Sequence, residues 1–231
     1  MANIAGHYGT SVRDEINLFT AWPIGTTVKL GDVGFLSRRG KLFERRANLS
    51  DFGVKFPVNK ATNTTDFDIA IARDFRMEFK GAGEPPPVWS SLLSTEVGVA
   101  IGFGSGTSVV VRAHTIESAI DNLQNLENDL VRVSTDPESR WHRKFVVVTA
   151  IYESTGTTIL LSNGKESNVD ITANAGINIP FDLADVKLGL SAAYGSRKLV
   201  SALARTGFAP FFRIHHITGH FWGSPRLDLY G

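Results

Sequence analysis

Hydrophobic and polar residues alternate clearly along residues 66–80. The apolar residues of this stretch fall on one face and the charged residues on the other, with Arg73 as a charge on the apolar side. A period of two residues places successive side chains on opposite faces of a β-strand, so the pattern predicts amphipathic strand. The apolar face comprises Phe67, Ile69, Ile71, Phe75, Met77 and Phe79.

Further strands follow from the same alternation and from short apolar runs. Residues 95–103 alternate between large apolar residues and glycine or alanine, and a glycine-rich turn at 104–106 leads into a valine-rich strand at 108–112. Residues 81–87 contain three consecutive prolines and predict an extended loop. The other expected strands are 27–30, 33–36, 41–46, 145–153, 157–162, 168–173, 185–193, 198–205 and 208–217, with turns at 37–40, 48–53, 154–156, 163–164 and 194–196.

A helical period occurs in two places. Apolar residues spaced three or four apart predict one main amphipathic helix over 115–133, which Asp136-Pro137 would end. A shorter stretch at 11–21 predicts a short N-terminal helix. Because strands precede and follow the main helix without regular β-α-β alternation, the expected fold class is α+β, with a twisted, largely antiparallel sheet. The helical stripe consists of Ile116, Ile120, Leu123, Leu126, Leu130 and Val133.

Composition limits the classes of protein. The chain has 231 residues, of which 42% are hydrophobic, and a net charge of +1, which fits one globular domain over 1–231. It contains no cysteine, which excludes disulfide scaffolds, thiolate metal sites and cysteine nucleophiles. Neither a secretory leader nor an apolar run of about 20 residues is present, so we expect a protein that is cytoplasmic as made.

Candidate catalytic and metal-binding residues have simpler explanations. His215, His216 and His220 lie in a strand-like stretch, where adjacent residues face opposite sides and do not share a metal. The glycine-rich segment 102–108 lacks the lysine of a phosphate-binding loop and precedes a strand. Trp141-His142-Arg143-Lys144 precedes a strand and is typical of a sheet cap. The sequence therefore predicts no enzyme, no cofactor and no metal.

The strongest local charge lies at 38–46, where five of nine residues are basic and surround Leu42 and Phe43. Three interpretations remain open at this point. The stretch is a solvated hairpin tip, a contact for a nucleic-acid backbone, or a contact for an anionic membrane, where each basic residue contributes about 1 kcal/mol. The near-neutral net charge disfavours nucleic acid.

The order of these features resembles the pore-forming domain of gasdermins. The similarity covers about 10–217 and is carried by Leu36-Ser37-Arg38-Arg39-Gly40-Lys41-Leu42-Phe43, by Ala47-Asn48-Leu49-Ser50-Asp51-Phe52 and by Phe145-Val146-Val147-Val148-Thr149-Ala150-Ile151.

This resemblance implies a non-enzymatic protein that binds acidic lipids, oligomerises and forms a β-barrel pore, as a cell-death or defence effector. Segments 66–80 and 95–112, then 145–162 and 166–174, would become membrane hairpins, since a spanning strand needs about 9–11 residues with one apolar face. Gasdermins usually carry an inhibitory C-terminal region. Here only a tail at 218–231 remains, so inhibition would need a partner protein or that tail. The implied lipid-binding residues are Arg38, Arg39, Lys41, Leu42, Phe43, Arg45 and Arg46.

The alternative function is a stable soluble α+β module that binds a small ligand or a protein partner. Amphipathic strands are equally typical of a soluble sheet with one solvated face. Under this alternative the basic stretch is only a solvated tip.

Overall fold

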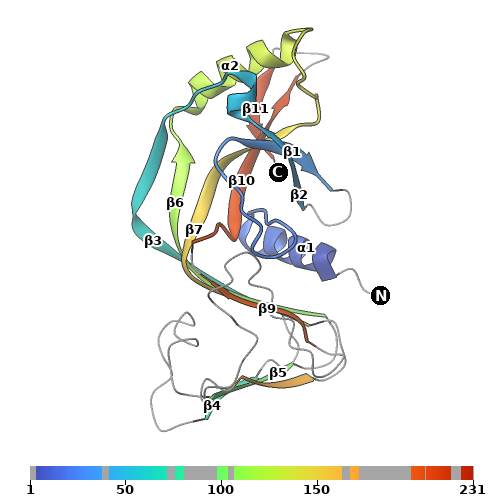
Figure 1. The fold of residues 1–231 in the computed structure, drawn as a ribbon, viewed down its shortest axis with the longest axis vertical. Helices are drawn as coiled ribbons and strands as arrows, with labels where there is room; N and C mark the ends of the chain where they lie inside the picture. Colours follow the sequence, from blue (N-terminus) through green and yellow to red (C-terminus); the bar gives the residue numbers. More distant parts are fainter. Residues whose placement is uncertain are drawn as a thin grey trace.

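The computed structural model describes residues 4–37, 42–71, 76–80, 98–103, 107–162, 167–171, 199–205, 207–219 and 225–230. All pairings between the named strands of these residues are antiparallel, and two α-helices accompany them (Figure 1), which confirms the α+β class. The elements are α1 (Ile4–Ile16), β1 (Asp32–Leu36), β2 (Phe43–Asn48), the 3-10 helix η1 (Leu49–Phe52), β3 (Val58–Ile71), β4 (Arg76–Lys80), β5 (Gly98–Phe103), β6 (Ser108–Ile120), α2 (Leu123–Thr135), β7 (Val146–Ser162), β8 (Ser167–Ile171), β9 (Leu199–Arg205), β10 (Phe211–Thr218) and β11 (Arg226–Leu229).

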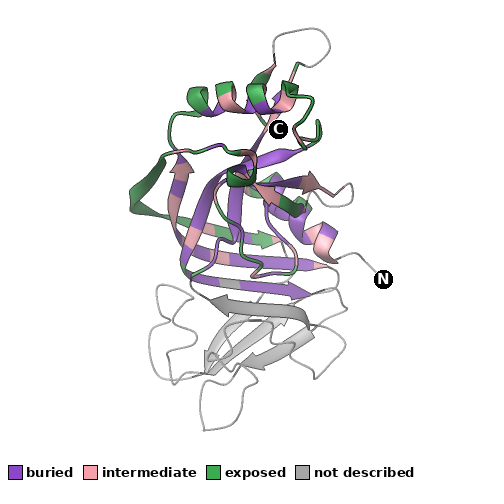
Figure 2. Ribbon diagram, turned by 45° about the horizontal axis from the view of Figure 1, so that its top comes forward, coloured by how far each residue is buried: buried purple, intermediate pink, exposed green. Residues whose placement is uncertain are grey.

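The 17-residue strand β7 is the central strand of the main sheet. One edge of β7 pairs with β1 and then with β6, and its other edge pairs with β10 and then with β9. The sheet therefore has the order β2-β1-β7-β10-β11 at one end and β3-β6-β7-β9 at the other. Figure 2 shows that the strands of this sheet carry most of the buried residues, while the outer side of α2 is exposed.

The sequence pattern was wrong about two strand features. Residues 27–30, expected as a strand, belong to no strand. The turn expected at 154–156 is wrong, because β7 runs through these residues without interruption. The register with β6 shifts between His114 and Thr115, which pair with Gly156 and Ser154, so Thr155 is an extra residue in a bulge. The Ser154-Thr155-Gly156 sequence therefore forms a bulge in a continuous strand and does not reverse the chain direction.

The helix expected over 115–133 is also wrong in its first part. Residues up to Ile120 belong to β6, which pairs with β3 on one side and β7 on the other. The helix α2 begins at Leu123, after Asn122 caps it by accepting a hydrogen bond from the backbone N–H of Asn125 at 3.1 Å. Ile116 and Ile120 fit both a helical and a strand period. Backbone pairing with β3 and β7 makes this segment a strand.

The first helix begins and ends earlier than the pattern predicts. α1 ends at Ile16, and the following Asn17 takes a positive φ of 56°. Tyr8 and Val12 of α1 are buried in a cluster with residues of β3, β6, β7 and β10. Phe19, expected on the helix, instead forms a β-bridge with Phe212.

Local signals around η1 were interpreted correctly. The turn or cap expected at 48–53 is a capping box, in which Asn48 N–H donates to the Asp51 carboxylate at 2.8 Å and the Asn48 side chain accepts from the backbone N–H of Ser50 at 3.1 Å. Gly53 ends the turn with φ 71°.

The amphipathic stretch 66–80 is divided between two sheets. Its first part belongs to β3, where Ile69 is buried and Asp68 is exposed, as the alternation predicts. Its last part is β4, which forms a second sheet with the order β4-β5-β8 at the opposite end of the molecule from α2 (Figure 1). The strand expected at 185–193 and the loops or turns expected at 38–40, 81–87, 104–106, 163–164 and 194–196 lie outside the described residues.

Candidate functional site

The hairpin of β1 and β2 carries the residues for which lipid binding is expected. Two hydrogen bonds between Ser37 and Leu42 close the hairpin. Ser37 N–H donates to the Leu42 carbonyl at 2.9 Å, and Leu42 N–H donates to Ser37 Oγ at 3.2 Å. Arg38, Arg39 and Lys41 lie between these two residues in sequence and outside the described residues.

The two apolar residues of this stretch are not equally accessible. Leu42 is half-buried, whereas Phe43 is only 5% exposed. The Phe43 ring packs edge-on against Phe212, with 5.5 Å between ring centroids. In this conformation Phe43 therefore belongs to the core, and only Leu42 of the pair has exposed surface.

Arg45 is anchored to a buried carboxylate at the base of the hairpin. Its Nε donates to Oδ1 of Asp32 at 2.8 Å, and Asp32 is 1% exposed. Asp32 also accepts from Asn48 Nδ2 at 3.1 Å and from the backbone N–H of Lys29 at 2.9 Å. The hydrogen bond that Arg45 donates to the Asp32 carboxylate is the main cause that raises the pKa of Arg45. Arg45 thus joins the two strands, while part of its side chain stays in solvent.

A second basic segment lies against this hairpin. The His142 ring is 5.0 Å from the ring of Phe35 on β1, and the Arg46 guanidinium lies 5.7 Å from the centre of the same Phe35 ring. Arg46 also lines a cavity of about 660 Å³ together with Arg132 and Arg140 and with the carboxylates of Asp51, Asp136 and Glu138. The loop Arg140–Lys144, called here the basic loop, is therefore adjacent to the β1–β2 hairpin.

The basic loop was interpreted from sequence only as a cap of the sheet. Trp141 does pack in this way, edge-on against Phe52 and Phe145 at 5.2 and 5.5 Å. Arg143 and Lys144 are exposed and have no hydrogen bond or ion pair from their side chains among the described residues. The sequence did not reveal that the basic loop adds positive charge beside the β1–β2 hairpin, because the two basic segments lie about 100 residues apart and meet only in the folded sheet. The sole available signal was the local excess of basic residues.

The described parts of four neighbouring strands of the main sheet reach one level. Ile71 at the end of β3 pairs with Val109 of β6, Ser108 of β6 pairs with Ser162 at the end of β7, and Ser162 pairs with Leu199 at the start of β9. The chain thus leaves and re-enters the sheet twice at adjacent positions. The two intervals are residues 72–107 and 163–198, 36 residues each.

The second sheet joins these two intervals. β4 and β5 come from the first interval and β8 comes from the second. Its register pairs apolar residues with apolar residues in two rows, Phe79-Val99-Ile171 and Met77-Ile101-Val169. The intervening row, Glu78-Ala100-Asp170, is polar or small. The alternation required for an amphipathic sheet is therefore in register across three strands.

The C-terminal strand is held by groups from distant parts of the chain. Arg13 of α1 is 7% exposed and donates to the Tyr230 carbonyl at 2.9 Å and to the Asn17 carbonyl at 2.8 Å. Burial lowers the pKa of Arg13. The backbone N–H of Leu227 donates to Glu127 of α2 at 2.8 Å. Part of the expected tail 218–231 is thus the paired strand β11, joined to both helices.

The histidine pair on β10 follows the strand alternation. His215 is 8% exposed and its Nδ1 lies 2.7 Å from Oγ1 of Thr149, while the His216 ring contacts Tyr230 at 4.9 Å between centroids. Burial, with a smaller effect of Arg213, lowers the pKa of His215 to about 4. His220 lies outside the described residues, and no group of three potential metal ligands occurs among those that are described.

The fold is similar to that of a bacterial gasdermin from Bradyrhizobium tropiciagri, with a TM-score of 0.43 and 13% sequence identity over 95% of this chain and 88% of that chain. No family model and no curated protein matches the sequence. Within the described part of the chain, neither helix is long and apolar enough to cross a membrane.

Proposed function

We propose that this protein is a non-enzymatic pore-forming protein that binds anionic membranes, oligomerises and inserts strands as a β-barrel, in the manner of the gasdermins that its sequence resembles. The observation that carries this proposal is the arrangement of two equal 36-residue intervals at four adjacent strand ends. Each interval, if extended, continues the two antiparallel strands that flank it.

The lengths suit a membrane hairpin. A tilted spanning strand needs about 9–11 residues, so two such strands and a turn fit within 36 residues. The apolar rows of the second sheet supply a lipid-facing side, and the row with Glu78, Ala100 and Asp170 supplies a side for water. The charge of Arg73 interrupts the apolar face of the first hairpin.

Closure of a barrel requires more than one copy. In the part of the sheet with order β3-β6-β7-β9, both β3 and β9 pair on one edge only among the described strands. Open edges are not tolerated in hydrocarbon, so four strands from one chain must join strands from further copies. This supports homo-oligomerisation on activation.

Membrane attachment is assigned to the hairpin and the basic loop together. We include Arg140, Arg143 and Lys144 with Arg38, Arg39, Lys41, Arg45 and Arg46. Each exposed basic residue near an anionic surface contributes about 1 kcal/mol, and Arg45 and Arg46, which pair with Asp32 and Glu44, contribute less than Arg143 and Lys144. Leu42 inserts first, and Phe43 follows only if the hairpin leaves its contact with Phe212.

Restraint of the inactive form is assigned to β11 or to an inhibitory partner protein. The bonds from Arg13 and to Glu127 hold β11 between the two helices. Loss of those bonds would expose the edge of β10 that pairs with β11, while β10 stays paired with β7 along the residues that lead into the second interval. A cell-death or defence role follows if insertion occurs in the membrane of a host cell.

A liposome assay tests the proposal. Purified protein, with and without proteolytic removal of β11, is incubated with dye-loaded vesicles that contain or lack anionic phospholipid. We expect dye release and protein pelleting only with anionic vesicles. Arg38→Glu/Arg39→Glu/Lys41→Glu, which leaves the Asp32–Arg45 bond intact, should abolish pelleting. Absence of both leakage and pelleting under every condition overturns the proposal in favour of a soluble binding module.

A further inference from the structure

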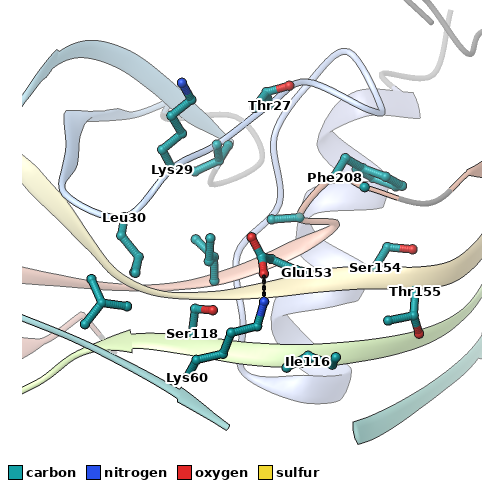
Figure 3. Close-up of a pocket in the computed structure, with 15 residues that line it drawn as sticks. Thr27, Lys29, Leu30, Lys60, Ile116, Ser118, Glu153, Ser154, Thr155 and Phe208 are labelled. Carbon is teal, nitrogen blue, oxygen red and sulfur yellow. Dashed lines mark hydrogen bonds and ion pairs between the residues drawn. The ribbon is translucent and has the colours of Figure 1, made fainter. Parts of the chain in front are cut away.

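A cavity of about 690 Å³ lies over one face of β3, β6 and β7. The loop 27–30 and the segment 207–209 form its other wall (Figure 3). None of the residues assigned above to membrane binding lines it. Its volume falls within the range of about 300–1,000 Å³ that is typical of small-molecule sites.

The lining of this cavity is mixed, with a buried apolar part. Val28, Phe208 and Ala209 of one wall and Ile151 of the sheet side are buried, the half-buried Ile116 belongs to β6, and Ser118 and Ser154 are buried polar residues of the same lining. Val58, which also lines the cavity, is 53% exposed, which is high for a valine on a sheet. The apolar residues of the lining fit a hydrocarbon chain, because covering them removes apolar surface from water.

The rim of the cavity is cationic. Lys60 Nζ lies 3.1 Å from Glu153 Oε2, and this ion pair crosses the sheet side of the cavity (Figure 3). Lys29 lies on the opposite wall; its side chain is exposed, and its ammonium group is turned away from the ion pair. Two lysines and one glutamate give the lining a net charge of +1.

Lys60 is placed to bind an anionic head group as it stands, and Lys29 would do so after a change of its side-chain rotamer. Lys60 carries three N–H donors and uses one on Glu153, and the flexible four-carbon stem of Lys29 allows its ammonium to swing over the cavity. Glu153, being already paired, opposes a second carboxylate only weakly.

We propose that this cavity binds a single-chain amphiphile with a carboxylate head group, of the fatty-acid class, whose chain lies over Ile116 and Ile151 and whose carboxylate is held by Lys29 and Lys60. The occupant is not covalently attached. Its site is independent of the basic loop and hairpin, so binding occurs in solution without a membrane.

Calorimetric titration with decanoate, below its micelle concentration and near neutral pH, tests this site. We expect saturable binding of one decanoate per protein and a rise in Tm, since a ligand that binds only the folded form stabilises it. Decanol, which has the same chain and no charge, should bind more weakly, and acetate, which lacks the chain, should not bind.

Two variants locate the site. Lys29→Ala should weaken decanoate binding about tenfold, equivalent to about 1.4 kcal/mol, and leave decanol binding unchanged. Ile116→Asp places a carboxylate in the apolar part of the lining and should abolish decanoate binding, with folding verified by circular dichroism. Lys55→Ala, an exposed lysine that does not line the cavity, is the matched control.

The proposal is overturned if decanoate shows no saturable binding, or if neither Lys29→Ala nor Ile116→Asp alters it. It is also overturned if Lys55→Ala weakens binding as much as Lys29→Ala, which would indicate a general charge effect. Because these readouts need no vesicles, their outcome is separate from that of the leakage assay.

Discussion

The guanidinium of Arg13 donates a hydrogen bond to the backbone carbonyl of Tyr230, and these two residues lie 217 positions apart. The same guanidinium covers the face of Phe19 at 4.4 Å from the ring centre. This bond connects the first helix to the last described residues of the chain, and the contact is partly buried.

Substitution of Arg13 by Leu is expected to loosen this connection. It removes two charge-assisted hydrogen bonds and leaves the Tyr230 carbonyl without a donor, which should lower the free energy of unfolding by about 2–3 kcal/mol. Urea denaturation measures this change. If β11 restrains the inactive form, the same variant should also release vesicle contents faster than the unmodified protein.

Lys55→Ala is the control for the Arg13 variant, since Lys55 is exposed and has no hydrogen bond or ion pair among the described residues. Unchanged stability of Arg13→Leu would contradict the structural role of the contact. Unchanged leakage with reduced stability would contradict only the restraint assigned to β11.

Asp32→Asn should weaken the base of the β1–β2 hairpin. The amide that replaces the carboxylate loses the charge that Arg45 binds, and part of the bonding to Asn48 and to the Lys29 N–H is lost as well. We expect a loss of about 1–3 kcal/mol in the free energy of unfolding. Glu44→Gln, which alters an exposed pair with Arg46, should change stability by less than about 0.5 kcal/mol. Equal effects of the two variants would contradict the anchoring role of Asp32.

The basic loop should contribute to membrane attachment although it is distant in sequence from the hairpin. Arg143→Glu/Lys144→Glu is expected to reduce pelleting with anionic vesicles by at least tenfold, because two attractive charges become repulsive. Lys29→Glu/Lys55→Glu alters the net charge equally outside this surface and should have a smaller effect. The difference should diminish as salt concentration rises. Equal losses in both double variants would show that only net charge matters.

His215 should make stability depend on pH. Its folded-state pKa of about 4 lies below the ordinary value of 6.5, so the unfolded chain takes up a proton first as the pH falls. The stabilisation is complete above pH 6.5 and is lost progressively between pH 6.5 and pH 4, by about 2–3 kcal/mol.

Urea denaturation of His215→Gln across this pH range measures that dependence. The variant should lose most of the decline in stability, whereas His142→Gln, at an exposed position, should retain it. An unchanged pH profile in His215→Gln would contradict the role assigned to the buried imidazole.

Features that depend on residues close together in the sequence were predicted correctly, and features that depend on distant partners were not. The turn at 48–53 was predicted because its capping box joins Asn48 and Asp51, three residues apart. The alternation at Phe67 and Ile69 was predicted because a strand that covers a core needs it wherever its partners lie. The division of 115–133 into β6 and α2 was not predicted, because Ile116 and Ile120 satisfy both a helical and a strand period. Their partners on β3, Thr64 and Val58, are distant along the chain, so no local pattern reveals the pairing.

The surface for which lipid binding is proposed shows the same limit of prediction from sequence. The basic stretch at 38–46 is visible in the sequence, but its character is changed by tertiary contacts: Phe43 enters the core, Arg45 is bound by Asp32 and the basic loop lies alongside. The single-domain organisation over 1–231 and the lipid-binding role of these residues stay predictions.

The sequence by itself determined the α+β class, the amphipathic strands, the local cap at Asn48 and the concentration of positive charge, because each depends on residues within a few positions of one another. Only the tertiary structure decided the continuity of β7 through Gly156, the docking of β11 by Arg13 and the alignment of four strand ends beside two equal intervals. These features arise from burial and backbone pairing between residues far apart along the chain, and no local pattern encodes which distant partner satisfies them.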